Sequence, residues 1–149
     1  MTDEIYSKKV MEHFANPHNV GEIPDATASA EAGNPICGDM MRFYIKVENN
    51  IIAEITFKTF GCGAAIASSS VLTDLVKGKT VDEAFAITKD MIVNELGGLP
   101  PHKVHCSILG VDALRKAICE YWKKEGKLSE HPDCEKIFGK FGHGEDSHR

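Results

Sequence analysis

Three cysteines in separate, turn-rich stretches are the residues best suited to do chemistry in this chain. Cys37 lies between an Asn-Pro-Ile stretch and a Gly-Asp pair, Cys62 lies between two glycines, and Cys106 follows a histidine. The gaps of 24 and 43 intervening residues exclude a compact CxxC zinc finger or redox dithiol. The fold must therefore bring three distant segments to one point, as open metal or cluster sites often require.

Two polar residues next to these cysteines are candidates for a fourth ligand. Asp39 lies two residues after Cys37 at the start of a predicted strand, where a period of two sends both side chains to the same side. His105 precedes Cys106 in the first turn of a predicted helix, but adjacent helical side chains diverge by about 100°, so the two need not bind the same ion. Alternatively, neither residue is a ligand: Asp39 is a solvated carboxylate at the end of a strand, and His105 packs beside the site.

The ligand types indicate which metal such a site would hold. A helix start favours a thiolate, and three soft thiolates with one imidazole or carboxylate suit zinc or an iron–sulfur cluster. A permanent cluster usually has four cysteines. Replacing one by Asp39 or His105 predicts a cluster that is held loosely and then passed on.

An enzyme is the alternative function from another class. Cys106 with His105 as a base would suit a cysteine-nucleophile transferase, and the thiols would suit a zinc hydrolase. The sequence lacks an HExxH-like zinc motif and a third group that orients the base. A relay that passes persulfide sulfur through these thiols without building a cluster is a further alternative.

The remaining cysteines and histidines have simpler interpretations. Cys119 is expected to pack in the core or in an interface. Cys134 and three tail histidines are interpreted as incidental residues of a flexible tail, with metal binding as the alternative; the histidines are His131, His143 and His148. His13 and His18 are interpreted as surface or structural residues.

Composition predicts one ordinary globular domain. The 149 residues are 42% hydrophobic and 26% charged, with a formal net charge of -5 and thus no basic excess to attract nucleic acid. No targeting signal precedes the first predicted helix, and no apolar run approaches the roughly 18 residues that span a bilayer. We therefore expect a cytoplasmic protein without membrane association, whose five cysteines do not form a disulfide framework.

Hydrophobic periodicity predicts an α+β fold in which helices pack on one face of a small antiparallel sheet of about three strands. A hairpin over residues 40–60 places Met41, Phe43, Ile45 and Val47 on one face of its first strand, and Ile51, Ala53, Ile55 and Phe57 on one face of its second. The third strand is expected from residues 26–34, unless a helix covers the hairpin instead. Helices are predicted over residues 4–15, 64–76, 80–96 and 104–125. We expect one domain over residues 1–126, followed by a flexible tail over residues 127–149.

Four ordered blocks resemble the IscU/NifU-type iron–sulfur cluster assembly scaffolds, and the resemblance covers about residues 4–125. The blocks are Tyr6-Ser7 through residues 16–21 (NPHNVG), residues 37–39 (CGD), residues 57–63 (FKTFGCG) running into residues 66–70 (IASSS), and residues 99–113 (LPPHKVHCSILGVDA). SufU-type relatives have an insertion between the first two cysteines and lack the His-Cys pair, so the chain is similar to the IscU branch.

The resemblance implies a scaffold, rather than an enzyme, on which a cysteine desulfurase delivers sulfur, iron arrives and a [2Fe–2S] cluster forms before transfer to acceptor apoproteins. It implies that Cys37, Cys62 and Cys106 are ligands or sulfur acceptors, that Asp39 tunes cluster lability and that His105 is the alternative fourth ligand. A zinc-bound form would use much the same atoms. The scaffold would be a monomer or a homodimer.

One departure concerns a partner protein. The family's Leu-Pro-Pro-Val-Lys segment is read by an Hsp70-type chaperone, and this chain has His102 in place of the valine. The substitution argues against that partnership, although the extended Pro-Pro shape remains.

Overall fold

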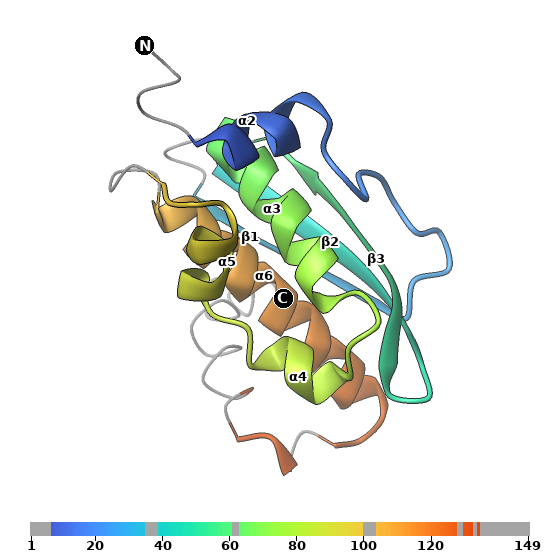
Figure 1. The fold of residues 1–149 in the computed structure, drawn as a ribbon. Coiled ribbons are helices and arrows are strands. Elements are labelled where there is room, and N and C mark those ends of the chain that lie inside the picture. Colours follow the sequence, from blue (N-terminus) through green and yellow to red (C-terminus); the bar gives the residue numbers. More distant parts are fainter. Residues whose placement is uncertain are drawn as a thin grey trace.

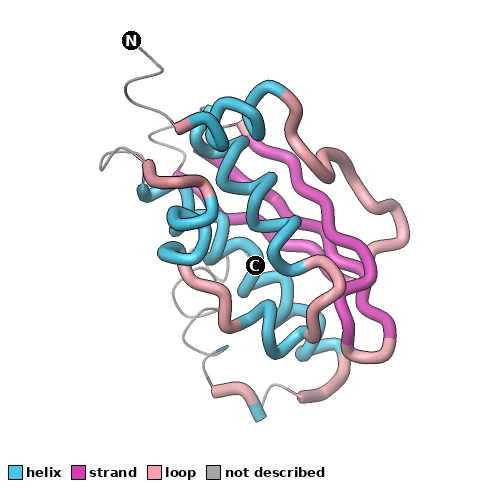
Figure 2. The backbone as a smooth tube through the Cα atoms, viewed as in Figure 1, coloured by secondary structure: helices cyan, strands magenta, loops and turns pink. Residues whose placement is uncertain are grey.

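The structure, a computed structural model, describes residues 7–34, 39–60, 63–99, 104–127, 130–132 and 134. A three-stranded antiparallel sheet in the order β1-β2-β3 forms one layer, and helices pack on one of its faces (Figures 1 and 2). This arrangement confirms the predicted α+β class. In chain order the elements are α2 (Lys8–Ala15), β1 (Ala28–Asn34), β2 (Asp39–Glu48), β3 (Ile51–Thr59), α3 (Gly63–Val76), α4 (Val81–Phe85), α5 (Lys89–Glu95) and α6 (Val104–Lys124).

The β2–β3 hairpin follows the predicted pattern up to a bulge. Its turn residues Asn49 and Asn50 have φ of 53° and 64°, the left-handed conformations that a tight hairpin turn requires. Lys46 pairs with Glu54 and Val47 with Ile52, so Ala53 has no partner in β2. The extra residue reverses the alternation, and Ile52 is buried while Ile51 is exposed. The prediction that Ile51 and Ala53 share the face of Phe57 was therefore wrong.

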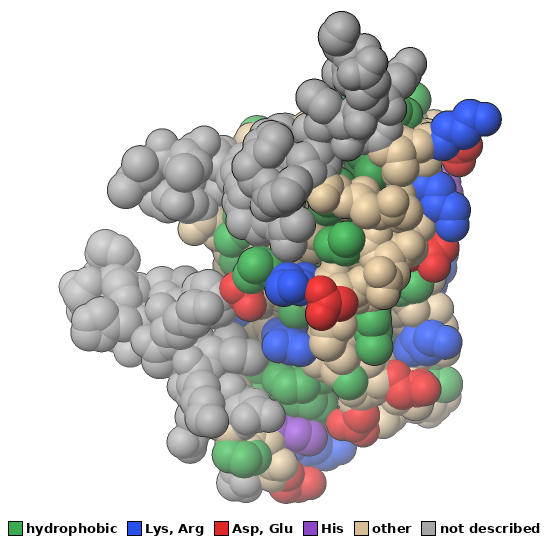
Figure 3. Space-filling model, turned by 60° about the vertical axis from the view of Figure 1, so that its left-hand side comes forward, with side chains coloured by type: hydrophobic (Ala, Val, Ile, Leu, Met, Phe, Trp, Pro, Cys, Tyr) green, Lys and Arg blue, Asp and Glu red, His purple; other side chains and the backbone are tan. Residues whose placement is uncertain are grey.

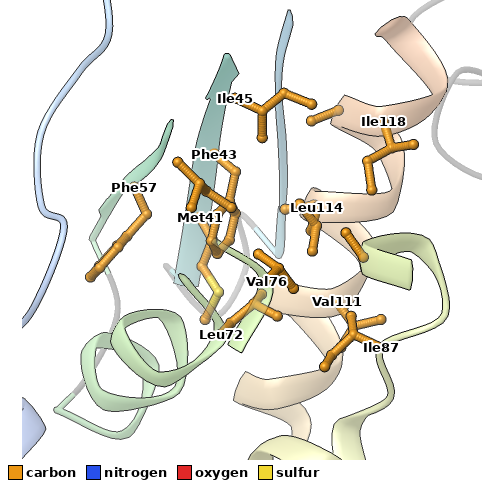
Figure 4. Close-up of a cluster of buried hydrophobic side chains, with 14 of the residues drawn as sticks. Met41, Phe43, Ile45, Phe57, Leu72, Val76, Ile87, Val111, Leu114 and Ile118 are labelled. Carbon is orange, nitrogen blue, oxygen red and sulfur yellow. The ribbon is translucent and has the colours of Figure 1, made fainter. Parts of the chain in front are cut away.

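The core lies between the sheet and helices α3 and α6. Met41, Phe43 and Ile45 project from β2 toward side chains of α3 and α6 (Figure 4). β1 contributes only small side chains to this face, namely buried Ala28, Ala30 and Ala32, which lets α6 pack closely against it. Five large apolar side chains of α6 are buried, namely Val111, Leu114, Ile118, Tyr121 and Trp122.

Capping residues set the helix boundaries. Ser7 caps α2 by accepting a hydrogen bond from Val10 N, and Thr80 and Glu83 form a reciprocal capping box at α4. The sequence predicted one helix from residue 80 to 96. Instead, the first helix ends at Ala86, its C-cap, and Thr88 caps a second helix, α5.

The segment between α2 and β1 covers the free edge of β3. Phe57 N donates to Asn19 O at 3.0 Å and Gly21 N donates to Phe57 O at 2.9 Å, a short parallel pairing. Lys58 and Lys46 on the outer sheet face pair with Glu22 and Asp25 of the same segment. The edge of β3 is thus protected, and residues 18–21 are held in a fixed position.

The described residues after α6 fold back onto that helix. His131 stacks on Trp122 with ring centroids 3.4 Å apart, and Cys134 forms a disulfide with Cys119; both cysteines are buried. The expectation that the cysteines form no disulfide was wrong for this pair, because a turn at Gly126 returns the chain to the helix face that presents Cys119. Most of residues 127–149 lie outside the described part, so their flexibility stays a prediction.

Basic and acidic side chains are interspersed on the face shown in Figure 3, with apolar side chains among them. Among the described residues, no helix combines the length and apolar character needed to cross a bilayer.

Candidate functional site

The predicted ligands lie at the borders of the described chain. Cys37 and Cys62 fall outside the described residues. Asp39 is the first residue of β2, and His105 and Cys106 are the second and third residues of α6; the backbone of these three is described and their side chains are not. The ligand set therefore stays a prediction, and the described neighbours show where its chain segments run.

The chain segments on either side of residues 37 and 62 lie at one end of the sheet. β1 ends at Asn34 and β2 begins at Asp39, and these two residues are Cα partners across the strand pair. Phe60 follows β3, and its N–H donates to Met40 O at 3.0 Å, so the exit of β3 lies against the start of β2. Gly63 begins α3 directly afterwards. An antiparallel hairpin places its first entry and last exit together, as the sequence indicated.

Helix α6 begins at the same end of the sheet. A Cβ added at Gly110 would lie 3.5 Å from Leu72 Cδ2 and 3.7 Å from Met41 Sδ, so the first half of α6 packs against α3 and the start of β2. At the other end of the helix, Lys124 Nζ donates to Thr27 O at 2.7 Å, beside the start of β1. Cys106 precedes Gly110 by about one turn, roughly 6 Å along the axis. All three cysteine-bearing segments thus approach the same end of the sheet.

Exposed apolar side chains surround this end of the sheet. Phe60 is 77% exposed, and Phe14 and Met40 are also exposed. Phe14 lies across the start of α3, where a Cβ added at Gly63 would come within 3.1 Å of its ring. We call Phe14, Met40 and Phe60 the apolar rim; it presents hydrophobic surface at the end of the sheet where β2 starts and β3 ends.

His13 and His18, which the sequence indicated to be surface or structural residues, lie as a pair between α2 and α3. His13 Nδ1 lies 2.7 Å from Ser70 Oγ, His18 Nδ1 lies 2.6 Å from Asp74 Oδ2, and the two imidazole centroids are 4.8 Å apart. Burial, and to a lesser degree the neighbouring His18, lower the pKa of His13, which keeps its ring neutral at pH 7. The partners are more than 50 residues apart in sequence, so no local pattern could have indicated this cluster.

Known proteins with similar sequences support one family. Residues 5–128 match the family model described as the NifU-like N-terminal domain. The iron–sulfur cluster assembly scaffold protein IscU 1 of Archaeoglobus fulgidus is 55% identical over 126 residues, which cover 85% of this chain and 82% of that protein. The IscU scaffold protein of Aquifex aeolicus is 52% identical over 134 residues, covering 87% of this chain and 85% of that protein.

A solved structure agrees at the level of the fold. The N-terminal part of a NifU-like protein from Brucella abortus superposes with a TM-score of 0.66 at 24% identity, covering 83% of this chain and 98% of that one. The family match extends over most of the chain, and the resemblance seen in the four sequence blocks is confirmed. The chain belongs to the family of NifU-like N-terminal domains, together with the IscU scaffolds.

Proposed function

We propose that this protein is a scaffold on which an iron–sulfur cluster is assembled and from which it is passed to acceptor proteins. The observation that supports this most strongly is the approach of three cysteine-bearing segments to one end of the sheet, in a chain 55% identical to a protein named as such a scaffold. In this proposal Cys37, Cys62 and Cys106 bind the cluster, and Asp39 or His105 provides the fourth ligand.

The cluster is cargo here, and its type is proposed to be [2Fe–2S]. A cysteine desulfurase transfers sulfane sulfur as the thiolate of a scaffold cysteine attacks the donor persulfide and the donor thiolate leaves. An external reductant then supplies a pair of electrons to convert this sulfur to sulfide, which bridges the incoming iron. Without iron, the same thiolates with Asp39 or His105 would suit Zn²⁺.

The weak fourth ligand and the apolar rim suit the transfer step. A carboxylate is a harder ligand than a thiolate, so a cluster held partly by Asp39 is easier to release. The exposed side chains of Phe14, Met40 and Phe60 offer hydrophobic surface for a desulfurase or an acceptor that docks over the site. We propose that this work takes place in the cytoplasm and, because His102 replaces the family's valine, without a dedicated Hsp70-type chaperone.

Anaerobic reconstitution tests the proposal. The protein is incubated with ferrous iron, cysteine and a desulfurase, and absorption and Mössbauer spectra are recorded on the wild type, Cys37→Ala and Cys106→Ala. We expect a [2Fe–2S] spectrum in the wild type and its loss in both variants. The matched control is Cys119→Ala/Cys134→Ala, which removes the disulfide pair and should leave the spectrum unchanged.

Two outcomes would contradict the proposal. One is the absence of a cluster in the wild type, and the other is a cluster that persists unchanged in Cys37→Ala and Cys106→Ala. Mass spectrometry of each cysteine separates a sulfur relay from a scaffold, since a relay would accumulate persulfide on these thiols without acid-labile sulfide.

A further inference from the structure

The two histidines between α2 and α3 lie with a carboxylate in an arrangement suited to metal binding. His13 belongs to α2, His18 to the segment after it, and Asp74 to α3. One potential ligand atom from each of the three lies within 4.8 Å of the others. His18 and Asp74 are 49% and 43% exposed, so an ion can reach them from solvent.

Both imidazoles are oriented through Nδ1. Ser70 Oγ lies 2.7 Å from His13 Nδ1 and Asp74 Oδ2 lies 2.6 Å from His18 Nδ1, while no described residue hydrogen-bonds to either Nε2. In protein metal sites a ligating histidine almost always donates its other ring N–H to a carboxylate, a carbonyl or a comparable acceptor, which fixes the ring and leaves one nitrogen for the ion. Each of the two histidines already has such a partner.

Hydrogen bonds from the backbone and from Asn19 hold these partners in place. The His18 backbone N–H donates to Ser70 Oγ at 2.8 Å, and a hydroxyl oxygen with two lone pairs can accept from both histidines. Asn19 Nδ2 lies 3.2 Å from Asp74 Oδ1 and 3.0 Å from Thr73 Oγ1. Asn19 itself is fixed by its pairing with β3.

A hollow next to the histidines gives an ion room for water ligands. It has a volume of about 380 Å³ and is lined by Glu12, His13, Ala15, Asn16 and His18. The Glu12 carboxylate adds negative charge on the open side. Ligand atoms around a tetrahedral Zn²⁺ are roughly 3.4 Å apart, since each bond is about 2.0–2.2 Å. The potential ligand atoms of the three side chains lie within 4.8 Å of one another, so the side chains must move closer together to bind one ion. The exposed His18 side chain can provide this movement.

We propose that His13 and His18 bind a divalent transition-metal ion of the Zn²⁺ or Fe²⁺ class through Nε2, and that Asp74 either joins them as a ligand or orients His18. Imidazole and carboxylate donors suit this class of ion. The site is distinct from the cysteine site and does not depend on it. It lies close by, since Phe14, the neighbour of His13, packs on Gly63 at the start of α3.

The test begins with the full chain carrying Cys37→Ser, Cys62→Ser and Cys106→Ser, which removes the thiolates of the proposed cluster site. Zn²⁺ is titrated calorimetrically, and Co²⁺ is added to record its absorption. We expect one ion per chain and a cobalt spectrum without sulfur-to-metal charge transfer. Nitrogen NMR of the histidine side chains should show a shift of Nε2 in His13 and His18 on Zn²⁺ binding.

Variants in this background locate the ion. His18→Gln should weaken Zn²⁺ binding at least tenfold, and Asp74→Asn by about 10- to 100-fold, the range for loss of a group that orients a ligand. Both side chains are about half exposed, so both variants should fold, which circular dichroism verifies. His143→Gln/His148→Gln is the matched control and should bind Zn²⁺ unchanged.

Three results would overturn the proposal: no Zn²⁺ binding in the Cys37→Ser/Cys62→Ser/Cys106→Ser background, equal affinity in His18→Gln and its parent, or binding that disappears with the tail histidines instead. None of them bears on cluster assembly, which is measured on the wild type with its cysteines intact.

Discussion

Reduction of the Cys119–Cys134 disulfide should destabilise the folded protein by about 3 kcal/mol. The bond closes a loop with a sequence separation of 15 residues, and in the chain-entropy model a loop of that length restricts the unfolded state by roughly 3 kcal/mol at 25 °C. This is a large fraction of the 5–15 kcal/mol that is typical of a folded domain. Reduction should also release the residues that bring His131 onto Trp122.

The single tryptophan of the chain makes this effect measurable. Trp122 lies one helical turn after Cys119 and stacks on His131, so its fluorescence reports both global unfolding and release of the tail. Urea unfolding of the Cys37→Ser/Cys62→Ser/Cys106→Ser variant with and without reductant avoids effects on the proposed ligands. The midpoint should fall by about 1–3 M urea on reduction, given a typical dependence of 1–3 kcal/mol per M.

A further variant provides the control. Cys119→Ala/Cys134→Ala should unfold near the midpoint of the reduced protein and should not respond to reductant. Equal midpoints for the oxidised and reduced protein would refute the reasoning, as would alkylation in denaturant without reductant that labels both cysteines.

Five further changes test other parts of the structure and of the proposal. Thr80→Ala removes the capping box and should lower the free energy of unfolding by about 1 kcal/mol in urea denaturation. The hydrogen bond from the Thr80 backbone N–H lowers the pKa of Glu83 below its usual 4.5. The stabilisation that ionised Glu83 provides is therefore present above pH 4.5 and is lost as the pH falls through the lowered pKa. Glu83→Gln should remove this acid dependence. Ser68→Ala should stabilise the protein by up to about 1 kcal/mol, because the buried Ser68 hydroxyl has no hydrogen-bond partner among the described residues and alanine favours helix; a loss of stability would contradict this. Leu114→Ala should cost about 2–5 kcal/mol through the cavity it leaves, and a cost below 1 kcal/mol would show that α6 is not packed on the sheet as described. Asp39→Ala should prolong the lifetime of the reconstituted cluster, followed by its absorption after addition of a chelator; faster loss would contradict the role of Asp39 as a weak ligand.

The secondary structure could be predicted from local patterns because each element contains its own signals. The alternation from Met41 to Ile45 and the helix start at residue 80 appear in the structure where the sequence indicated them, the helix beginning at the capping pair of Thr80 and Glu83. The two errors in the elements are also local. The bulge at Ala53 reversed the faces of one strand end, and Thr88 capped a second helix where a continuous one was expected.

Contacts between distant elements could not be predicted in the same way. The approach of the chain segments that flank Cys37 and Cys62 was foreseeable, because a hairpin joins them, but α6 is brought to this end by packing against other elements, as at Gly110. The Cys119–Cys134 bond depends on a chain reversal whose direction no periodicity specifies.

The histidine cluster shows why such contacts matter for function. His13 and His18 each look like an ordinary surface residue in sequence. Ser70, the partner of His13, ends the stretch of small residues in α3, and Asp74, the partner of His18, follows one turn later. The first half of α3 buries mainly alanine and serine, so it can approach its neighbours closely, and its few polar groups meet side chains from other elements at hydrogen-bond distance. Ser70 is buried and Asp74 is half exposed one turn later, so the same helix both holds the partly buried His13 and keeps His18 at the surface. The packing that positions α3 at this end of the sheet therefore also brings together the side chains of the proposed histidine metal site.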